Sequence, residues 1–310
     1  ALAKRPVDAE RVLYLSKLAA FFHDNGQRQA TLGGLVALGK NTKAISDELI
    51  KLDARVAAQP AVVLDAGALA AISDPEDGGP IAELFVMIAE MIPAALGPSQ
   101  ASLGVTKKDR IESRGGHPLR LAVAAWMGAL GITGDFDLYV GGPDPRGAYG
   151  ITGETPAIVL GSGITQPFDA AARAAVARAV FGIKRGTSAV RTRDERAIAS
   201  LVAAASIEAG VNCPQPQFAV YGEIARAVHK EMPRKVRKAI PEVCQRVLQS
   251  GQDPVAWALA AQRSFDRMAV IAAGDVSIVL ADALKAPRDQ LGGLAADSER
   301  AARLLGFVLS

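Results

Sequence analysis

The stretch of residues 155–187 constrains the fold of this chain more than any other. A short apolar run at 157–160 ends at Gly161 and Gly163, which predicts a buried strand closed by a turn. An alanine-rich segment at about 169–184 follows, with Asp169 at its beginning and basic residues at its end, as the helix dipole favours. We therefore expect a strand that leads into a long helix, which Gly186 ends.

The rest of the chain predicts a mainly α protein with a small antiparallel β-sheet. Apolar residues make up 50% of the 310 residues but aromatic residues only 5%, which favours helices that pack through small side chains. Strands are expected at 136–140, 149–151 and 155–160. Helices are expected at 81–96, 119–130, 193–209, 218–230, 233–248, 254–284 and 298–307. The turn-forming segment 73–80 is expected to cap the helix at 81–96.

The N-terminal sixty residues predict paired amphipathic helices. Apolar positions at helical spacing run to Phe22, residues 24–26 break the run, and Leu32, Leu35 and Leu38 share one face of a second helix. A third helix is expected from about residue 40 to 58. The pattern L-x-x-L-A-x-x-F-x-x-x-G at 15–26 resembles one tetratricopeptide repeat, and the alternative is an ordinary helical hairpin.

Two separated segments resemble zinc metallopeptidases of the gluzincin type, which carry H-E-x-x-H and a downstream glutamate. The helix after the strand aligns with H-E-x-x-H, but Arg178 and Gly182 stand at the histidine positions and Ala179 at the general-base position. The segment 261–268 resembles the family's A-E-x-S-x-D-R-A helix. It keeps Ser264, Asp266 and Arg267, whereas Gln262 replaces the glutamate that is the third zinc ligand in that family.

These replacements remove the zinc chemistry that the resemblance would otherwise imply. Zinc requires imidazole, carboxylate or thiolate donors. Arg178 is a permanent cation, Gly182 offers no donor, and alanine cannot accept a proton from water. We therefore expect no metal, no cofactor and no catalytic residue, with Arg178, Gly182, Gln262, Asp266 and Arg267 lining a vacated cleft. Within it, Arg178 is predicted to pair with Asp266.

The whole chain resembles the C-terminal region of large bacterial tetratricopeptide-repeat proteins that carry a degenerate gluzincin-like domain. That resemblance implies tetratricopeptide-like hairpins at 1–60, a helical connection at 61–133, the degenerate domain at 134–285 and a helical tail at 286–310. It further implies a cytoplasmic, non-catalytic scaffold that binds protein partners. The alternatives are a hydrolase with a relocated or metal-free site and a basic nucleic-acid-binding protein.

The nucleic-acid alternative depends on a basic helical face at 218–248, where seven basic residues stand against three acidic ones. Six of the seven are the candidate binding residues and are called the basic face: Arg226, Lys230, Arg234, Lys235, Arg237 and Lys238. Few aromatic residues interrupt this face, so base stacking is not favoured, and a solvated helix surface is the simpler interpretation. The charged segment 185–196 has mixed sign and is interpreted as surface.

The remaining features exclude several classes of protein. The net charge of +3 does not by itself indicate nucleic acid or membrane. No apolar run reaches the length of about 18 residues that a membrane span requires, and no signal peptide is recognised. Cys213 and Cys244 suggest a reducing compartment without disulfides. His117 lies in a glycine- and proline-rich loop. It is interpreted either as an anion-binding group or as a side chain that hydrogen-bonds to nearby backbone.

Overall fold

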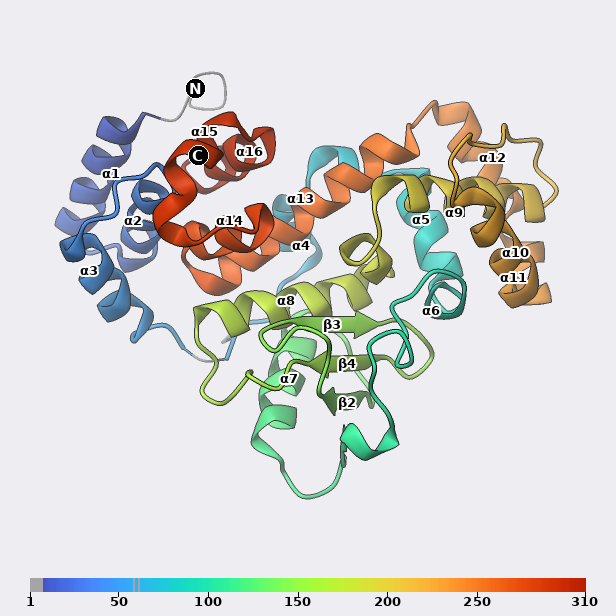
Figure 1. The fold of residues 1–310 in the computed structure, drawn as a ribbon, viewed down its shortest axis with the longest axis horizontal. Coiled ribbons are helices and arrows are strands. Elements are labelled where there is room, and N and C mark those ends of the chain that lie inside the picture. Colours follow the sequence, from blue (N-terminus) through green and yellow to red (C-terminus); the bar gives the residue numbers. More distant parts are fainter. Residues whose placement is uncertain (1–7, 58, 61) are drawn as a thin grey trace. The chain divides into compact units, whose positions relative to one another are not determined.

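The computed structural model describes residues 8–57, 59–60 and 62–310, and most of these residues are helical (Figure 1). A small β-sheet accompanies the helices, so the predicted mainly α class with a minor β component is confirmed. Among the described helices, none combines the length and apolar character needed to cross a membrane.

The sheet is mixed rather than antiparallel, which corrects the prediction. Its described strands are β1 (Arg110–Ile111), β2 (Asp137–Val140), β3 (Ala148–Ile151) and β4 (Ala157–Leu160), in the order β1-β2-β4-β3. β4 pairs in parallel with β2 and antiparallel with β3. All four residues of β4 are buried, which suits the inner position of this apolar strand between β2 and β3. The two-residue β1 pairs antiparallel with β2.

The long helix α8 (Ala170–Arg185) follows β4 as predicted, and Gly186 ends it with a positive φ of 68°. Its second half packs against β3 at Gly150 (Figure 1). A Cβ at Gly150 would collide with the backbone carbonyl oxygen of Ala179 and crowd the side chain of Ile183. Glycine at this position therefore lets the helix backbone approach the strand directly.

The chain forms two compact units that are discontinuous in sequence. Unit 1 comprises residues up to Ala61, Thr165–Ala177 and Asp266–Ser310, and unit 2 comprises Val62–Ile164 and Arg178–Phe265. The four consecutive segments expected from the resemblance stay a prediction. Two helices, α8 and α13 (Pro254–Ala273), each contribute residues to both units.

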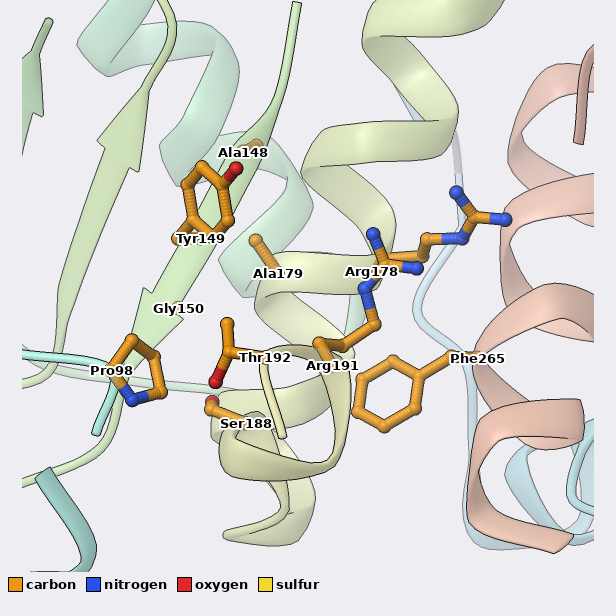
Figure 2. Close-up of a pocket in the computed structure, with 10 residues that line it drawn as sticks. All are labelled: Pro98, Ala148, Tyr149, Gly150, Arg178, Ala179, Ser188, Arg191, Thr192 and Phe265. Carbon is orange, nitrogen blue, oxygen red and sulfur yellow. The ribbon is translucent and has the colours of Figure 1, made fainter. Parts of the chain in front are cut away.

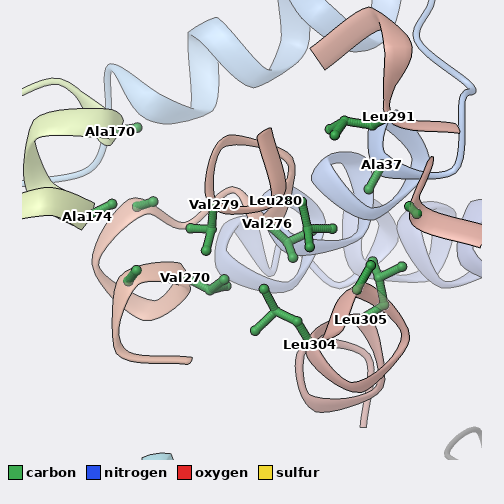
Figure 3. Packing of buried hydrophobic residues seen from close by; sticks show 14 residues of the cluster. Ala37, Ala170, Ala174, Val270, Val276, Val279, Leu280, Leu291, Leu304 and Leu305 are labelled. Carbon is green, nitrogen blue, oxygen red and sulfur yellow. The ribbon is translucent and has the colours of Figure 1, made fainter. Parts of the chain in front are cut away.

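Unit 1 is helical and has its main core around α14. Besides parts of α8 and α13, it contains α1 (Ala9–Phe21), α2 (Asn25–Ala37), α3 (Lys43–Asp53), α14 (Val276–Leu284), η5 (Arg288–Gln290), α15 (Leu291–Asp297) and α16 (Glu299–Val308). Figure 3 shows Val276 and Leu280 of α14 amid the buried cluster, near Leu304 and Leu305 of α16. The helix expected at 254–284 is broken at Gly274, where φ is 75°. Asp275 then caps α14 by accepting a hydrogen bond from the Ser277 backbone N–H at 2.9 Å.

Unit 2 holds the sheet and a second set of helices. These are α4 (Ala66–Ile72), η2 (Pro75–Asp77), α5 (Pro80–Ile88), α6 (Ile92–Ala95), η3 (Lys107–Asp109), α7 (Pro118–Ala129), η4 (Ser188–Arg191), α9 (Glu195–Glu208), α10 (Tyr221–Glu231), α11 (Arg234–Ala239) and α12 (Pro241–Ser250). Two helices predicted as continuous are interrupted, at residues 89–91 before Pro93 and at Ile240 before Pro241, because proline is tolerated in the first turn of a helix but not in its interior. Trp257 stacks on Phe85 with ring centroids 4.7 Å apart, as a core anchor should.

Candidate functional site

The position that a zinc-binding histidine would occupy on α8 is closed by packing. A Cβ at Gly182 would lie 3.0 Å from Ser188 Oγ and 3.1 Å from a ring carbon of Phe265. Phe265 also packs edge-to-face on Phe181, with centroids 5.6 Å apart. A side chain as large as histidine has no room here unless these neighbours move, so the glycine has a structural reason of its own.

Arg178 lies one turn before Gly182 and is only 3% exposed. It lines a cavity of about 10 Å³ together with Ser188, Phe265 and residues of β3 (Figure 2). This volume is about that of one water molecule, and almost all of the accessible lining is apolar. The Ser188 hydroxyl is buried and has no hydrogen-bond partner among the described residues. The cavity is therefore too small for a substrate.

The other three residues of the predicted cleft lie on α13, and their sharing a cleft with Arg178 stays a prediction. Gln262 is half-buried on the unit 2 part of α13 and lines neither of the cavities described in this section. Asp266 belongs to unit 1, where Arg300 Nε and Nη2 donate to its carboxylate at 2.6 and 2.9 Å. The guanidinium of Arg267, also in unit 1, lies 5.0 Å from the centre of the Phe307 ring. Arg178 and Asp266 belong to different units, and their pairing stays a prediction.

The described residues contain no group of three or more His, Cys, Asp or Glu side chains that could hold a metal ion. His117 caps α7, because its Nδ1 accepts a hydrogen bond from the Leu119 N–H at 3.3 Å. This is the backbone-bonded alternative that the sequence left open. Cys213 and Cys244 are both free thiols, and burial raises the pKa of each.

A buried acid network in unit 2 was not anticipated from the turn-forming segment 73–80. Its members are Asp74, Asp77, Arg185 and Arg263. Asp77 is 1% exposed, and one of its carboxylate oxygens accepts a hydrogen bond from Arg185 Nη1. Arg263 Nε donates to Asp74 at 2.8 Å. Arg185, expected only to favour the helix dipole, therefore also holds the 73–80 segment against α8.

Burial raises the pKa of Asp77 from 3.8 to about 6, although the neighbouring Arg185 guanidinium opposes the rise. A carboxyl group removed from water loses the solvation that stabilises its charged form. The indole N–H of Trp257 donates to the Asp77 backbone carbonyl at 3.2 Å, which fixes the segment further. The network is enclosed, and its charges are paired within the protein.

The basic face at 218–248 is exposed, and part of its charge is paired. Arg237 forms an ion pair with Glu208 at 2.7 Å, and Lys230 with Glu231 at 3.1 Å. Arg226 donates to the Gly222 carbonyl at 3.2 Å. Within the described part of the chain, the three remaining members form no ion pair with an acidic residue: Arg234, Lys235 and Lys238. They extend into solvent from the six-residue helix α11, as a solvated surface would.

A larger, open cleft in unit 2 contains residues that the sequence analysis assigned to surface. It has a volume of about 450 Å³ and lies among the 96–103 segment, Tyr149 of β3 and the 191–193 connection between η4 and α9. Arg191, Thr192 and Arg193 follow one another along its wall. Arg191, Thr192, Tyr149 and Pro98 also line the small cavity beside Arg178, so the two spaces adjoin (Figure 2). We call this space the arginine cleft.

The sequence carried one usable signal for this cleft, namely two arginines separated by a single residue in a short connection. The mixed sign of the segment concealed it, because Asp194 directly follows Arg193. In the structure, Asp194 caps α9 by accepting from the Ala197 N–H at 2.8 Å. Its charge is therefore committed to the helix N-terminus.

Comparison of the chain with protein-family models, with curated proteins and with solved structures finds no match. The candidate site must therefore be interpreted from its own chemistry.

Proposed function

We propose that this protein is a non-catalytic scaffold that binds a partner protein through the exposed face of helix α1. The observation that carries the proposal is a second apolar stripe on this helix. Val12, Ser16 and Ala19 are buried on one side of α1, which packs against α2 as a helical hairpin. Apolar side chains are nevertheless exposed on the other side of the helix.

The exposed stripe has helical spacing. Tyr14, Leu18 and Phe21 stand at i, i+4 and i+7, and their side chains are 64%, 36% and 76% exposed. Phe22, just beyond the helix, is 71% exposed and meets the Phe21 ring edge-to-face at 5.2 Å. Scattered apolar residues on a protein surface need no explanation, but a contiguous aromatic stripe marks an interaction surface.

The geometry of the stripe favours a helical hairpin as the partner element. A helix presents its ridges at the same spacing that α1 offers, and two such surfaces interlock. Stacked helical pairs bury the faces that an isolated pair leaves exposed, and the tetratricopeptide-like pattern at 15–26 fits such stacking. Aromatic side chains each bury roughly 150–250 Å², so three of them supply substantial contact area.

The non-catalytic part of the proposal is supported by the side chains at the peptidase positions. Arg178, Ala179, Gly182 and Gln262 provide no set of zinc ligands and no general base. Ser188 and Phe265 occupy the space beside Gly182. Elemental analysis showing one tightly bound zinc per chain would contradict this part.

Site-specific photocrosslinking tests the docking surface. A benzoylphenylalanine at position 22 preserves the aromatic character of Phe22 and is expected to give a discrete covalent adduct with a second polypeptide in expressing cells. Val86 of α5 is 61% exposed and serves as the matched control position. The adduct should disappear when Tyr14 and Phe21 are replaced by serine. Equal adducts from position 86, or a product of twice the chain's own mass, would refute a heterologous partner at α1.

A further inference from the structure

The basic face is a dense cluster of positive charge that the scaffold function does not use. Residues 226–238 contain six basic residues and a single acidic one, Glu231. We propose that the basic face binds the phosphate backbone of double-stranded nucleic acid without reading its bases. A duplex carries one negative charge per roughly 1.7 Å of its axis, which matches a closely spaced group of cations.

Most of the charge of the basic face is not neutralised by the protein itself. Two of its members, Lys230 and Arg237, form the ion pairs described above. The contact of Arg226 is with a backbone carbonyl, which is neutral and leaves the charge of the guanidinium in place. Within the described chain, no acidic residue forms an ion pair with Arg226 or with three further residues of α11: Arg234, Lys235 and Lys238. These four cations remain available to phosphate groups.

Helix α11 is held in a fixed position within unit 2. The residues that flank it, Met232 and Ile240, are 4% and 0% exposed. Arg237 of α11 pairs with Glu208 of α9 at 2.7 Å, which ties the helix to its neighbour. The three other basic residues of α11 are exposed and stand at positions i, i+1 and i+4, so they share one side of the helix. The backbone that carries them does not have to become ordered when a ligand binds.

The surroundings of the basic face favour a nucleic acid over a protein or a membrane. Between residues 221 and 247, every large apolar side chain is buried or half-buried. A protein interface has an apolar core, and a helix that lies on a membrane inserts apolar side chains into it. Contacts with a phosphate backbone require neither, because they are electrostatic.

The lack of aromatic residues favours a duplex over a single strand. No Phe, Tyr or Trp occurs at residues 226–238. Proteins that bind single strands without sequence preference stack the bases on such side chains. A duplex already stacks its bases internally and presents its phosphates outward, so exposed cations are sufficient to bind it. Such binding is independent of sequence and strongly dependent on salt.

Fluorescence anisotropy with a short labelled DNA duplex tests this proposal. If each of the four unpaired cations contacts one phosphate, a plot of log K against log salt concentration should have a slope of roughly −3.6. A single strand of the same length should bind several times more weakly. Vesicles of phosphatidylcholine and phosphatidylserine in equal parts should bind more weakly than the duplex at the same salt concentration.

Two variants locate the binding on α11. Joint replacement of Arg234, Lys235 and Lys238 by glutamine should weaken duplex binding at low salt by at least about tenfold and reduce the slope to about −0.9. Lys235→Gln alone should change the slope by about 0.9, because one phosphate contact is lost. All three side chains are exposed, so both variants should fold, which circular dichroism checks.

A matched control removes the same net charge from unit 1. Lys40, Lys43 and Lys51 are exposed there, and their joint replacement by glutamine should leave the slope unchanged. An equal loss of affinity in this control would show that only the net charge of the chain matters and would overturn the proposal. Binding that does not depend on salt, or tighter binding of the single strand or of the vesicles than of the duplex, would also overturn it.

Discussion

Two arginine-rich regions of unit 2 differ in burial. In the buried acid network, Arg185 and Arg263 each contact a carboxylate that is almost fully buried. In the arginine cleft, Arg191 and Arg193 are exposed and line an open space. The comparison teaches that arginine content alone does not show what an arginine contributes to stability. The burial of the carboxylate that an arginine contacts decides how much is lost when that arginine is replaced.

The largest expected effect is a loss of stability when Arg185 is replaced. Arg185→Gln leaves the buried Asp77 carboxylate without its cation, so we expect the free energy of unfolding to fall by about 3 kcal/mol. Urea denaturation followed by circular dichroism measures the change. Lys184→Gln is the control, because the neighbouring Lys184 makes only a long 3.4 Å contact with the Gly131 carbonyl. If Arg185→Gln lowers the free energy of unfolding no more than the control does, the buried acid network does not stabilise the fold.

A change in pH is expected to have an intermediate effect on the free energy of unfolding. The pKa of Asp77 is about 6 in the folded protein and near 3.8 in the unfolded chain, so between these values the folded state binds the extra proton. The contribution of Asp77 to stability therefore rises as the pH falls through 6, by about 1 kcal/mol between pH 7 and pH 5.

The Asp77→Asn variant isolates this contribution. Burial also raises the pKa of Asp275 in unit 1, so the wild-type profile combines several groups. The difference between wild type and Asp77→Asn in thermal unfolding at pH 5 and pH 7 removes that shared background. Identical pH dependence in the two proteins would contradict the raised pKa of Asp77.

The smallest expected effect on stability comes from replacing the exposed Arg193. Arg193→Gln makes the same chemical change as Arg185→Gln at an exposed position, where substitutions usually alter stability by less than about 0.5 kcal/mol. The same urea denaturation measures this change in the free energy of unfolding. A stability loss as large as that of Arg185→Gln would assign Arg193 a structural role and remove the distinction between the two regions.

Much of the fold was predictable because it depends on local patterns. The helical hairpin at the N-terminus, the strand at 157–160 and the long helix after it follow from apolar spacing and from glycine at their ends. The predicted helices that proved too long were divided before Pro93, before Pro241 and at Gly274. Proline and glycine at these positions disfavour a helix interior, and the expected lengths did not take this into account.

The candidate sites were less predictable. Gly182 drew attention as a missing zinc ligand, whereas its contacts with Ser188 and Phe265 come from other elements of the chain. Asp77 and Arg185 are more than a hundred residues apart, and no local pattern links them. Asp194 concealed the positive character of the cleft, because sequence gives its charge but not its hydrogen-bond partner.

By itself, the sequence determined the helical class, the chemistry present at each peptidase position and the amphipathic character of α1. These properties depend on residue type and on spacing within one element, which short-range sterics and hydrogen bonding control. Only the tertiary structure decided the parallel pairing of β4 with β2, the burial of Asp77 and the opening of the arginine cleft. Each of these depends on which distant segments exclude water from one another, and that outcome is a property of the whole packed chain.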